Sequence, residues 1–246
     1  MVFRQWILKK EGINLRSSFF RGIFRVVSKE DEMERNTPRE LRNDLLGNKV
    51  KENLEKRNFE AYYCPTKEAA LEKAKELITN DQVVSWGGSV SIDEMGLLEY
   101  VKENNKVIDR DLAQSGEERM EIMRQALLAD TFIMGTNAMS EDGILVNIDG
   151  NGNRVAALCF GPKQVIVIAG INKISKTLDD AVNRARGTAA TINAQRFPGL
   201  KTPCYETGIC GNCKSKESIC SQVVVTRTNR IPGRIKVIVV GEELGF

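Results

Sequence analysis

Short apolar segments that alternate with longer helix-forming segments constrain the fold of this chain more than any other feature. Strands are expected at 59–64, 82–86, 131–134 and 165–169, and two more at 223–226 and 235–240. Helical segments separate most of these strands, an order typical of a mainly parallel sheet with helices on both faces. The predicted fold class is therefore α/β.

Several helix boundaries carry recognisable signals. Residues 37–40 combine a capping threonine, a proline suited to the first helical position and a glutamate that completes a capping box. A second capping box is predicted from Ser91 to Glu94. Longer helices are expected over 117–128 and 178–195.

The pattern changes after residue 143. Ile144, Val146 and Ile148 alternate with less apolar residues, as in a strand with one buried face. The glycine- and asparagine-rich segment 149–153 then predicts a turn, and 155–158 is expected to return as the second strand of a hairpin.

Composition and charge narrow the function classes. With 41% hydrophobic and 28% charged residues, the 246-residue chain can bury one sizeable core, which we place in 37–246. Residues 1–29 hold seven Lys or Arg and one acidic residue, so the rest of the chain has 29 basic and 32 acidic residues. A main domain with a net charge of −3 lacks the basic surface that nucleic-acid binding requires.

Residues 1–36 form an Arg-rich segment with three open interpretations: a flexible or helical arm, an over-extended start, or a targeting or membrane-surface helix. Charged residues interrupt its apolar stretches, so we expect no signal peptide. No run of 18 apolar residues is present, so we expect no transmembrane segment. The predicted location is cytoplasmic.

The sequence contains no histidine. This removes the commonest general base and the commonest nitrogen ligand for metals. Any chemistry must therefore use carboxylates, Lys, Tyr, Cys, backbone amides or a bound cofactor.

Two glycine-rich turns follow predicted strands. Gly87-Gly88-Ser89 comes directly after one strand, and Gly135-Thr136-Asn137 comes after another. Ligands of open α/β sheets bind beyond the carboxyl ends of the strands, so these turns are candidates for holding a small carboxylate or phosphate. The alternative is that the glycines serve only tight turns with positive φ. The GxGxxG and GxxxxGK[ST] fingerprints are absent, so neither NAD nor a P-loop nucleotide is expected.

Three motifs carry a resemblance to a known family. They are residues 85–89 (SWGGS), 129–143 (from Ala-Asp through Gly-Thr-Asn-Ala to Glu-Asp-Gly) and 147–155 (NIDGNGNRV). Together they are similar to the LUD domain of the lactate utilization protein C family, over about residues 37–246. The resemblance implies a NagB/RpiA/CoA-transferase-like fold and a role in oxidising L-lactate to pyruvate beside iron-sulfur partner subunits.

For this chain, the resemblance implies an anion-binding site between the two glycine-rich turns. Several polar groups would hydrogen-bond a hydroxyl or carboxylate of the ligand. The candidate ligand-binding residues are Gly87, Gly88, Ser89, Gly135, Thr136, Asn137, Asn147, Asp149, Asn151 and Asn153. The candidate catalytic carboxylates are Glu94 and Glu141, which could instead be capping or surface residues. Asp149-Gly150 could equally serve the turn alone.

The C-terminal part contains a four-cysteine loop over 204–220. Cys204, Cys210, Cys213 and Cys220 have the spacing C-x5-C-x2-C-x6-C. Four thiols this close, in a chain expected in a reducing compartment, favour a metal centre over disulfides. Tetrahedral zinc and a 4Fe-4S cluster both use four thiolates, and free thiols in a loop are the alternative. Cys64 and Cys159 stand alone, and we expect them to be buried as small apolar residues rather than to be reactive.

Three functions remain open. The first is a subunit that binds a small carboxylate and supports iron-sulfur-dependent oxidation of L-lactate. The second is a free-standing transferase, isomerase or ligase that acts on a phosphorylated or carboxylated metabolite. The third is a binding module in which the cysteine centre senses redox state.

Overall fold

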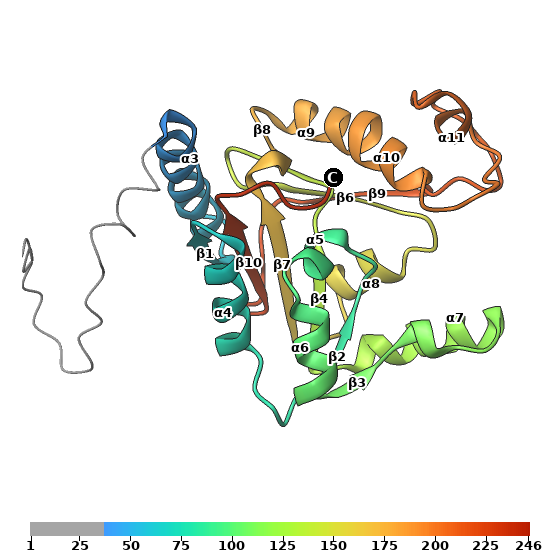
Figure 1. The fold of residues 1–246 in the computed structure, drawn as a ribbon, viewed down its shortest axis with the longest axis horizontal. Coiled ribbons are helices and arrows are strands. Elements are labelled where there is room, and N and C mark those ends of the chain that lie inside the picture. Colours follow the sequence, from blue (N-terminus) through green and yellow to red (C-terminus); the bar gives the residue numbers. More distant parts are fainter. Residues whose placement is uncertain (1–36) are drawn as a thin grey trace, which may run out of the picture. The chain divides into compact units, whose positions relative to one another are not determined.

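The computed structural model describes residues 37–246. The predicted basic arm, residues 1–36, lies outside the described residues. The first described helix, α3 (Pro38–Glu55), begins as predicted, because the Thr37 side chain accepts a hydrogen bond from the Glu40 amide and Glu40 returns one to the cap. The domain then alternates strands and helices (Figure 1).

The main sheet is six-stranded and entirely parallel, which confirms the predicted α/β class. Its strand order is β1-β10-β7-β4-β2-β3. The strands are β1 (Glu60–Cys64), β2 (Val83–Trp86), β3 (Lys106–Ile108), β4 (Thr131–Gly135), β7 (Gln164–Gly170) and β10 (Ile235–Val240). The short edge strand β3 was not expected from the sequence.

Helices cover both faces of this sheet, and the alternation of side chains along each strand explains how. Val165 and Val167 of β7 face a core shared with α3 and α8 (Asn153–Cys159), whereas Ile166 and Ile168 face the opposite core. The second face is covered by α4 (Lys67–Leu77), α5 (Val90–Glu94) and α6 (Leu97–Asn104). Because both faces are buried, the central strands are apolar throughout rather than alternating with polar residues.

A second, four-stranded sheet has the order β8-β5-β6-β9. Its strands are β5 (Ala138–Ser140), β6 (Leu145–Asp149), β8 (Ile174–Ser175) and β9 (Gln222–Thr226). A long helix packs on it, formed by α9 (Leu178–Arg184), a π-helical turn (Ala185–Ala189) and α10 (Ala190–Ala194), close to the predicted 178–195. The remaining elements are α7 (Gly116–Gln125), α11 (Pro203–Thr207) and the 3₁₀ turns η1 (Arg110–Leu112), η2 (Ala126–Leu128) and η3 (Ile171–Lys173).

Two local predictions are wrong. Residues 155–158 belong to α8 rather than to a returning strand, because Gly152 has a φ of +85° and the Asp149 carboxylate accepts from the amides of Arg154 and Val155. Strand β6 instead pairs with β5 and β9. The capping box at Ser91 is also absent, because Ser91 lies inside α5 and its hydroxyl donates to the Leu244 carbonyl.

No helix within residues 37–246 is both long and apolar enough to cross a membrane.

Candidate functional site

The two glycine-rich turns lie side by side at the carboxyl edge of the main sheet. Strands β2 and β4 are parallel neighbours, so the residues that follow them emerge at the same edge. The contact is close, because a Cβ added at Gly135 would lie 2.6 Å from Ser89 Oγ. The sheet topology therefore brings together two turns that are more than forty residues apart in the sequence.

Both turns line one pocket of about 380 Å³. This volume is within the usual range for small-molecule sites. The pocket is lined by every predicted ligand-binding residue except Asn147, namely Gly87, Gly88, Ser89, Gly135, Thr136, Asn137, Asp149, Asn151 and Asn153. Asn147 is fully buried behind the wall, where its side-chain oxygen accepts a hydrogen bond from Arg154.

The glycines of the turns are needed for space rather than for backbone conformation. None of Gly87, Gly88 and Gly135 has a positive φ, contrary to the tight-turn alternative. A Cβ at Gly87 would lie 2.7 Å from Cδ of Arg154, and one at Gly88 would lie 2.7 Å from Nη2 of Arg110. The absence of side chains at these positions lets two guanidinium groups approach the strand ends.

Arg154 is the structural centre of the pocket wall. Its guanidinium donates to the Gly135 carbonyl at 3.1 Å, to Asn147 Oδ1 at 2.7 Å and to Asn137 Oδ1 at 2.8 Å. These acceptors and the Ile148 carbonyl, which also accepts from Arg154, are all neutral, so within residues 37–246 no carboxylate is hydrogen-bonded to the guanidinium. Burial lowers the pKa of Arg154 and Asp149 opposes this shift, but an arginine stays charged at physiological pH. The wall therefore holds a cation that ties the second turn, through Gly135 and Asn137, to Asn147 of β6.

Lys173 is a second buried cation in the pocket. It lies at the end of η3, directly after the central strand β7, and its side chain is almost completely buried. Its ammonium donates to Ser91 Oγ at 2.7 Å and makes no ion pair with the described part of the chain. Burial, with smaller effects of Arg184 and Arg154, lowers the pKa of Lys173 to about 7, and Glu94 opposes the shift. Lys173 can thus bind an anion as a cation, or accept a proton as a neutral amine.

Cations outnumber carboxylates around the pocket. The basic lining residues are Arg110, Arg119, Arg154, Lys173 and Arg196, and the acidic ones are Asp93, Asp111 and Asp149. Two of the three carboxylates are already engaged, since Asp111 pairs with Arg119 at 2.8 Å and Asp149 caps α8. The remaining positive charge favours an anionic ligand.

The two predicted catalytic carboxylates are not among the residues that line the pocket. Glu94 Oε2 accepts a hydrogen bond from the Gly245 amide at 2.8 Å, although its charge still affects Lys173. Glu141 pairs with Lys176 at 2.9 Å. Their catalytic role therefore stays a prediction, with Glu94 next to the pocket and Glu141 in an ion pair outside its lining.

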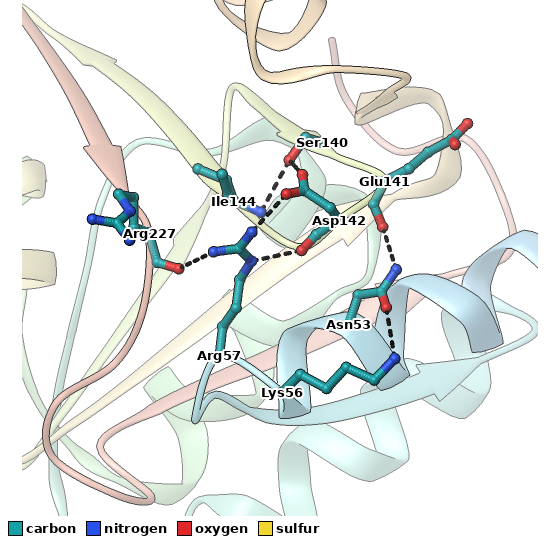
Figure 2. Close-up of polar contacts among 8 residues, drawn as sticks. All are labelled: Asn53, Lys56, Arg57, Ser140, Glu141, Asp142, Ile144 and Arg227. Carbon is teal, nitrogen blue, oxygen red and sulfur yellow. Dashed lines mark hydrogen bonds and ion pairs between the residues drawn. The ribbon is translucent and has the colours of Figure 1, made fainter.

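Figure 2 shows the surroundings of Glu141, where the turn after β5 docks on the end of α3. Arg57, two residues after the end of α3, donates to the Asp142 carbonyl and carboxylate, both at 2.6 Å, and to the Arg227 carbonyl at 3.0 Å. Asn53 donates to the Glu141 carbonyl at 2.9 Å. Glu141, a candidate catalytic residue, and its neighbour Asp142 therefore lie at a structural junction between α3 and the second sheet.

The four cysteines line a separate cavity of about 360 Å³. Cys204 is buried, Cys220 is half-buried, Cys210 and Cys213 are exposed, and all are free thiols. Of the two isolated cysteines, Cys64 is buried as predicted, whereas Cys159 is exposed because it lies at the end of α8, so its predicted burial is wrong. Burial, together with the other three thiols, raises the pKa of Cys220 to about 11, and Arg186 opposes this shift. Within residues 37–246, no three Cys, Asp or Glu side chains already lie at metal-ligating distance of one point.

The basic residues of the pocket were not predicted from the sequence. Arg110 follows β3, Lys173 follows β7 and Arg154 opens α8 after β6. Each lies within a few residues of the carboxyl end of a strand, and this position was the available signal. The position after a strand end led to the prediction of the two glycine-rich turns, but the basic residues in the same kind of position were not predicted.

No curated protein sequence matches the chain significantly. Among solved structures, a DUF162 family protein from Deinococcus radiodurans is similar at a TM-score of 0.48 and 14% identity, over 80% of this chain and 98% of that chain. The eIF2B delta structure from Chaetomium thermophilum has a TM-score of 0.30 and 20% identity, over 45% of this chain and 48% of that chain.

The sequence model of the LUD domain matches residues 47–240, most of the chain. The match spans the main sheet from β1 to β10, both glycine-rich turns, Arg154, Lys173 and the cysteine loop. The chain therefore belongs to the LUD domain family, which is associated with lactate utilization.

Proposed function

We propose that this protein binds a small carboxylate in the pocket between the glycine-rich turns and acts as a subunit of an iron-sulfur-dependent system that oxidises L-lactate to pyruvate. The observation that carries the proposal is the buried Lys173, which makes no ion pair with any residue of 37–246, in a pocket with an excess of cations. An isolated ammonium in a low-dielectric site is costly, and an anionic ligand would offset that cost.

The inner part of the pocket supports the same conclusion. Arg110 Nε is buried and donates no hydrogen bond to the part of the chain that the structure describes. A buried donor without a protein partner is uncommon and points to a partner supplied by a ligand or by water. Nη2 of the same guanidinium would lie 2.7 Å from a Cβ at Gly88, so the group lies at the first turn. Nε itself is 3.9 Å from the Asp111 carboxylate, too far for a hydrogen bond.

Direct binding tests the proposal. Calorimetric titration of the full chain with L-lactate, pyruvate and inorganic phosphate should detect saturable binding of at least one anion. Gly88→Ala should weaken that binding by about tenfold, or about 1.4 kcal/mol, because the added methyl displaces the Arg110 guanidinium. Gly116→Ala, whose Cβ would point into open space, is the matched control. Absence of binding by all three anions would refute the anion site.

The catalytic part of the proposal needs a second assay. Lactate-dependent reduction of a dye should be negligible with the isolated chain and should appear when iron-sulfur partner subunits are added. If the partners' activity is the same with and without this chain, its role in lactate oxidation is refuted.

A free-standing enzyme is the second candidate, and Lys173 favours it. The pocket is larger than a three-carbon acid requires, and a lysine with a pKa of about 7 can serve as a general base or a nucleophile. Product formation from a phosphorylated or carboxylated metabolite by the isolated chain would support this function. Lys173→Arg should then abolish turnover while the variant still binds the anion, because arginine keeps the charge but cannot be deprotonated.

A further inference from the structure

The four-cysteine cavity is the feature that the proposed anion site leaves unexplained. Its four thiols come from α11 and from the loop that follows it, and all four line the same cavity. We propose that Cys204, Cys210, Cys213 and Cys220 hold one thiophilic metal centre, zinc or a 4Fe-4S cluster, and that this centre fixes one wall of the anion pocket.

Two of the four cysteines, Cys204 and Cys220, are held in place by the surrounding fold. Cys204 is buried on α11, where its carbonyl accepts a hydrogen bond from Gln195 Nε2 at 3.0 Å. Cys220 packs against the apolar cluster between the second sheet and α9. These two lining residues are therefore positioned by the protein itself, without a metal.

The other two thiols lie on a segment with little structure of its own. Residues 206–214 are all exposed and include no strand, and α11 ends at Gly208 with a φ of +74°. In its central part, the Arg186 guanidinium donates a hydrogen bond to the Asn212 side chain. Such a segment can swing Cys210 and Cys213 inward, which metal binding requires because the thiols do not yet converge.

A loop without a core is where a metal contributes most to folding. A four-thiolate site supplies the cross-link that hydrophobic packing does not. Arg186, which lines the cavity, would partly balance the negative charge of the centre. Zinc would act structurally, whereas an iron-sulfur cluster would also allow one-electron chemistry.

The cysteine loop is in direct contact with the anion pocket. Ile219, the residue before Cys220, lines both cavities. A Cβ at Gly150 would lie 3.4 Å from the Ile219 Cα, so the loop backbone packs on the turn that follows Asp149. Ordering the loop would therefore order the pocket wall, a coupling that rests on the proposed anion binding.

Metal analysis of the full chain tests the centre itself. Protein purified anaerobically, from zinc-rich and from iron-rich cultures, should contain either about one zinc per chain, or about four iron and four sulfide per chain with absorbance at about 400 nm. Cys210→Ser and Cys213→Ser should lose most of the metal but remain folded, because both side chains are exposed. Cys159→Ser, at an exposed cysteine outside the cavity, should keep it. Metal-free wild-type protein from both cultures, or full occupancy in both variants, would overturn the centre.

Phosphate titration of metal-loaded and metal-stripped protein tests the coupling. We expect stripping to weaken phosphate binding by at least about fivefold, and hydrogen exchange in 206–219 to increase. Equal affinity in the two forms would overturn the coupling and leave the metal centre standing. Metal bound at full occupancy with no phosphate binding in either form would instead refute the anion site.

Discussion

Replacing Lys173 by methionine should make the protein more stable and at the same time unable to bind its anion. Lys173 is buried and, within residues 37–246, donates a hydrogen bond to Ser91 alone; burial is the main reason that its pKa falls from 10.5 to about 7. The unfolded chain keeps this amine in water with its ordinary pKa. The folded state therefore bears a cost that an uncharged side chain of similar length avoids.

The size of the effect follows from the two pKa values. A tenfold change in proton affinity corresponds to about 1.4 kcal/mol, so burying Lys173 costs about 4 kcal/mol of folding free energy at pH 7. The variant loses the hydrogen bond to Ser91 Oγ, a loss of about 1 kcal/mol. The net stabilisation of Lys173→Met is about 3 kcal/mol, or a rise in Tm of about 6–12 °C for a chain of this size.

The pH dependence has a definite sign. Between pH 7 and 10.5 the unfolded chain holds a proton on Lys173 that the folded protein releases, so wild-type stability rises with pH through this window. The advantage of Lys173→Met should shrink accordingly and nearly vanish at about pH 10. Thermal or urea unfolding of both proteins at pH 7, 8.5 and 10 measures it.

Lys176→Met is the matched control. Lys176 is an exposed lysine paired with Glu141, so its replacement should leave both the Tm and anion binding nearly unchanged. If Lys173→Met destabilises the protein at pH 7, or if its stability difference from wild type is the same at pH 7 and pH 10, the account of Lys173 as an unpaired buried amine is wrong.

Three further outcomes are expected. Gly143→Ala should destabilise by at least about 2 kcal/mol in urea unfolding, because φ is +86° and the new Cβ would lie 2.9 Å from the Leu54 amide nitrogen; a loss below about 0.5 kcal/mol would contradict the close packing. Arg57→Ala should cost about 1–3 kcal/mol of stability without changing phosphate affinity, since its bonds to Asp142 lie away from the pocket; a large change in affinity would argue against a purely structural junction. Phosphate affinity should fall as sodium chloride rises from about 0.05 to 0.5 M, because the pocket is open to solvent ions and positively charged; salt-independent binding would mean that the ligand is held mainly by uncharged contacts.

Local sequence signals were sufficient where a segment's environment matches its own pattern. The capping box at Thr37 and the apolar run of β7 were predicted from a few neighbouring residues, because caps and buried strands depend on local chemistry. The segment 155–158 was misassigned because its apolar residues fit either a strand or a helix. The helix forms because the Asp149 carboxylate accepts hydrogen bonds from the amides of Arg154 and Val155 at its start.

The α/β class, the two glycine-rich turns and the four-thiol loop could each be recognised without the structure, because the residues that define them are close together in the chain. The positions of Arg110, Arg154 and Lys173 around those turns follow from the tertiary fold alone. The same is true of Glu141, which lies at a junction with α3. The physical reason is strand order: parallel strands that are distant in the chain end at one edge of the sheet, and the burial that lowers the pKa of Lys173 exists only once they are assembled.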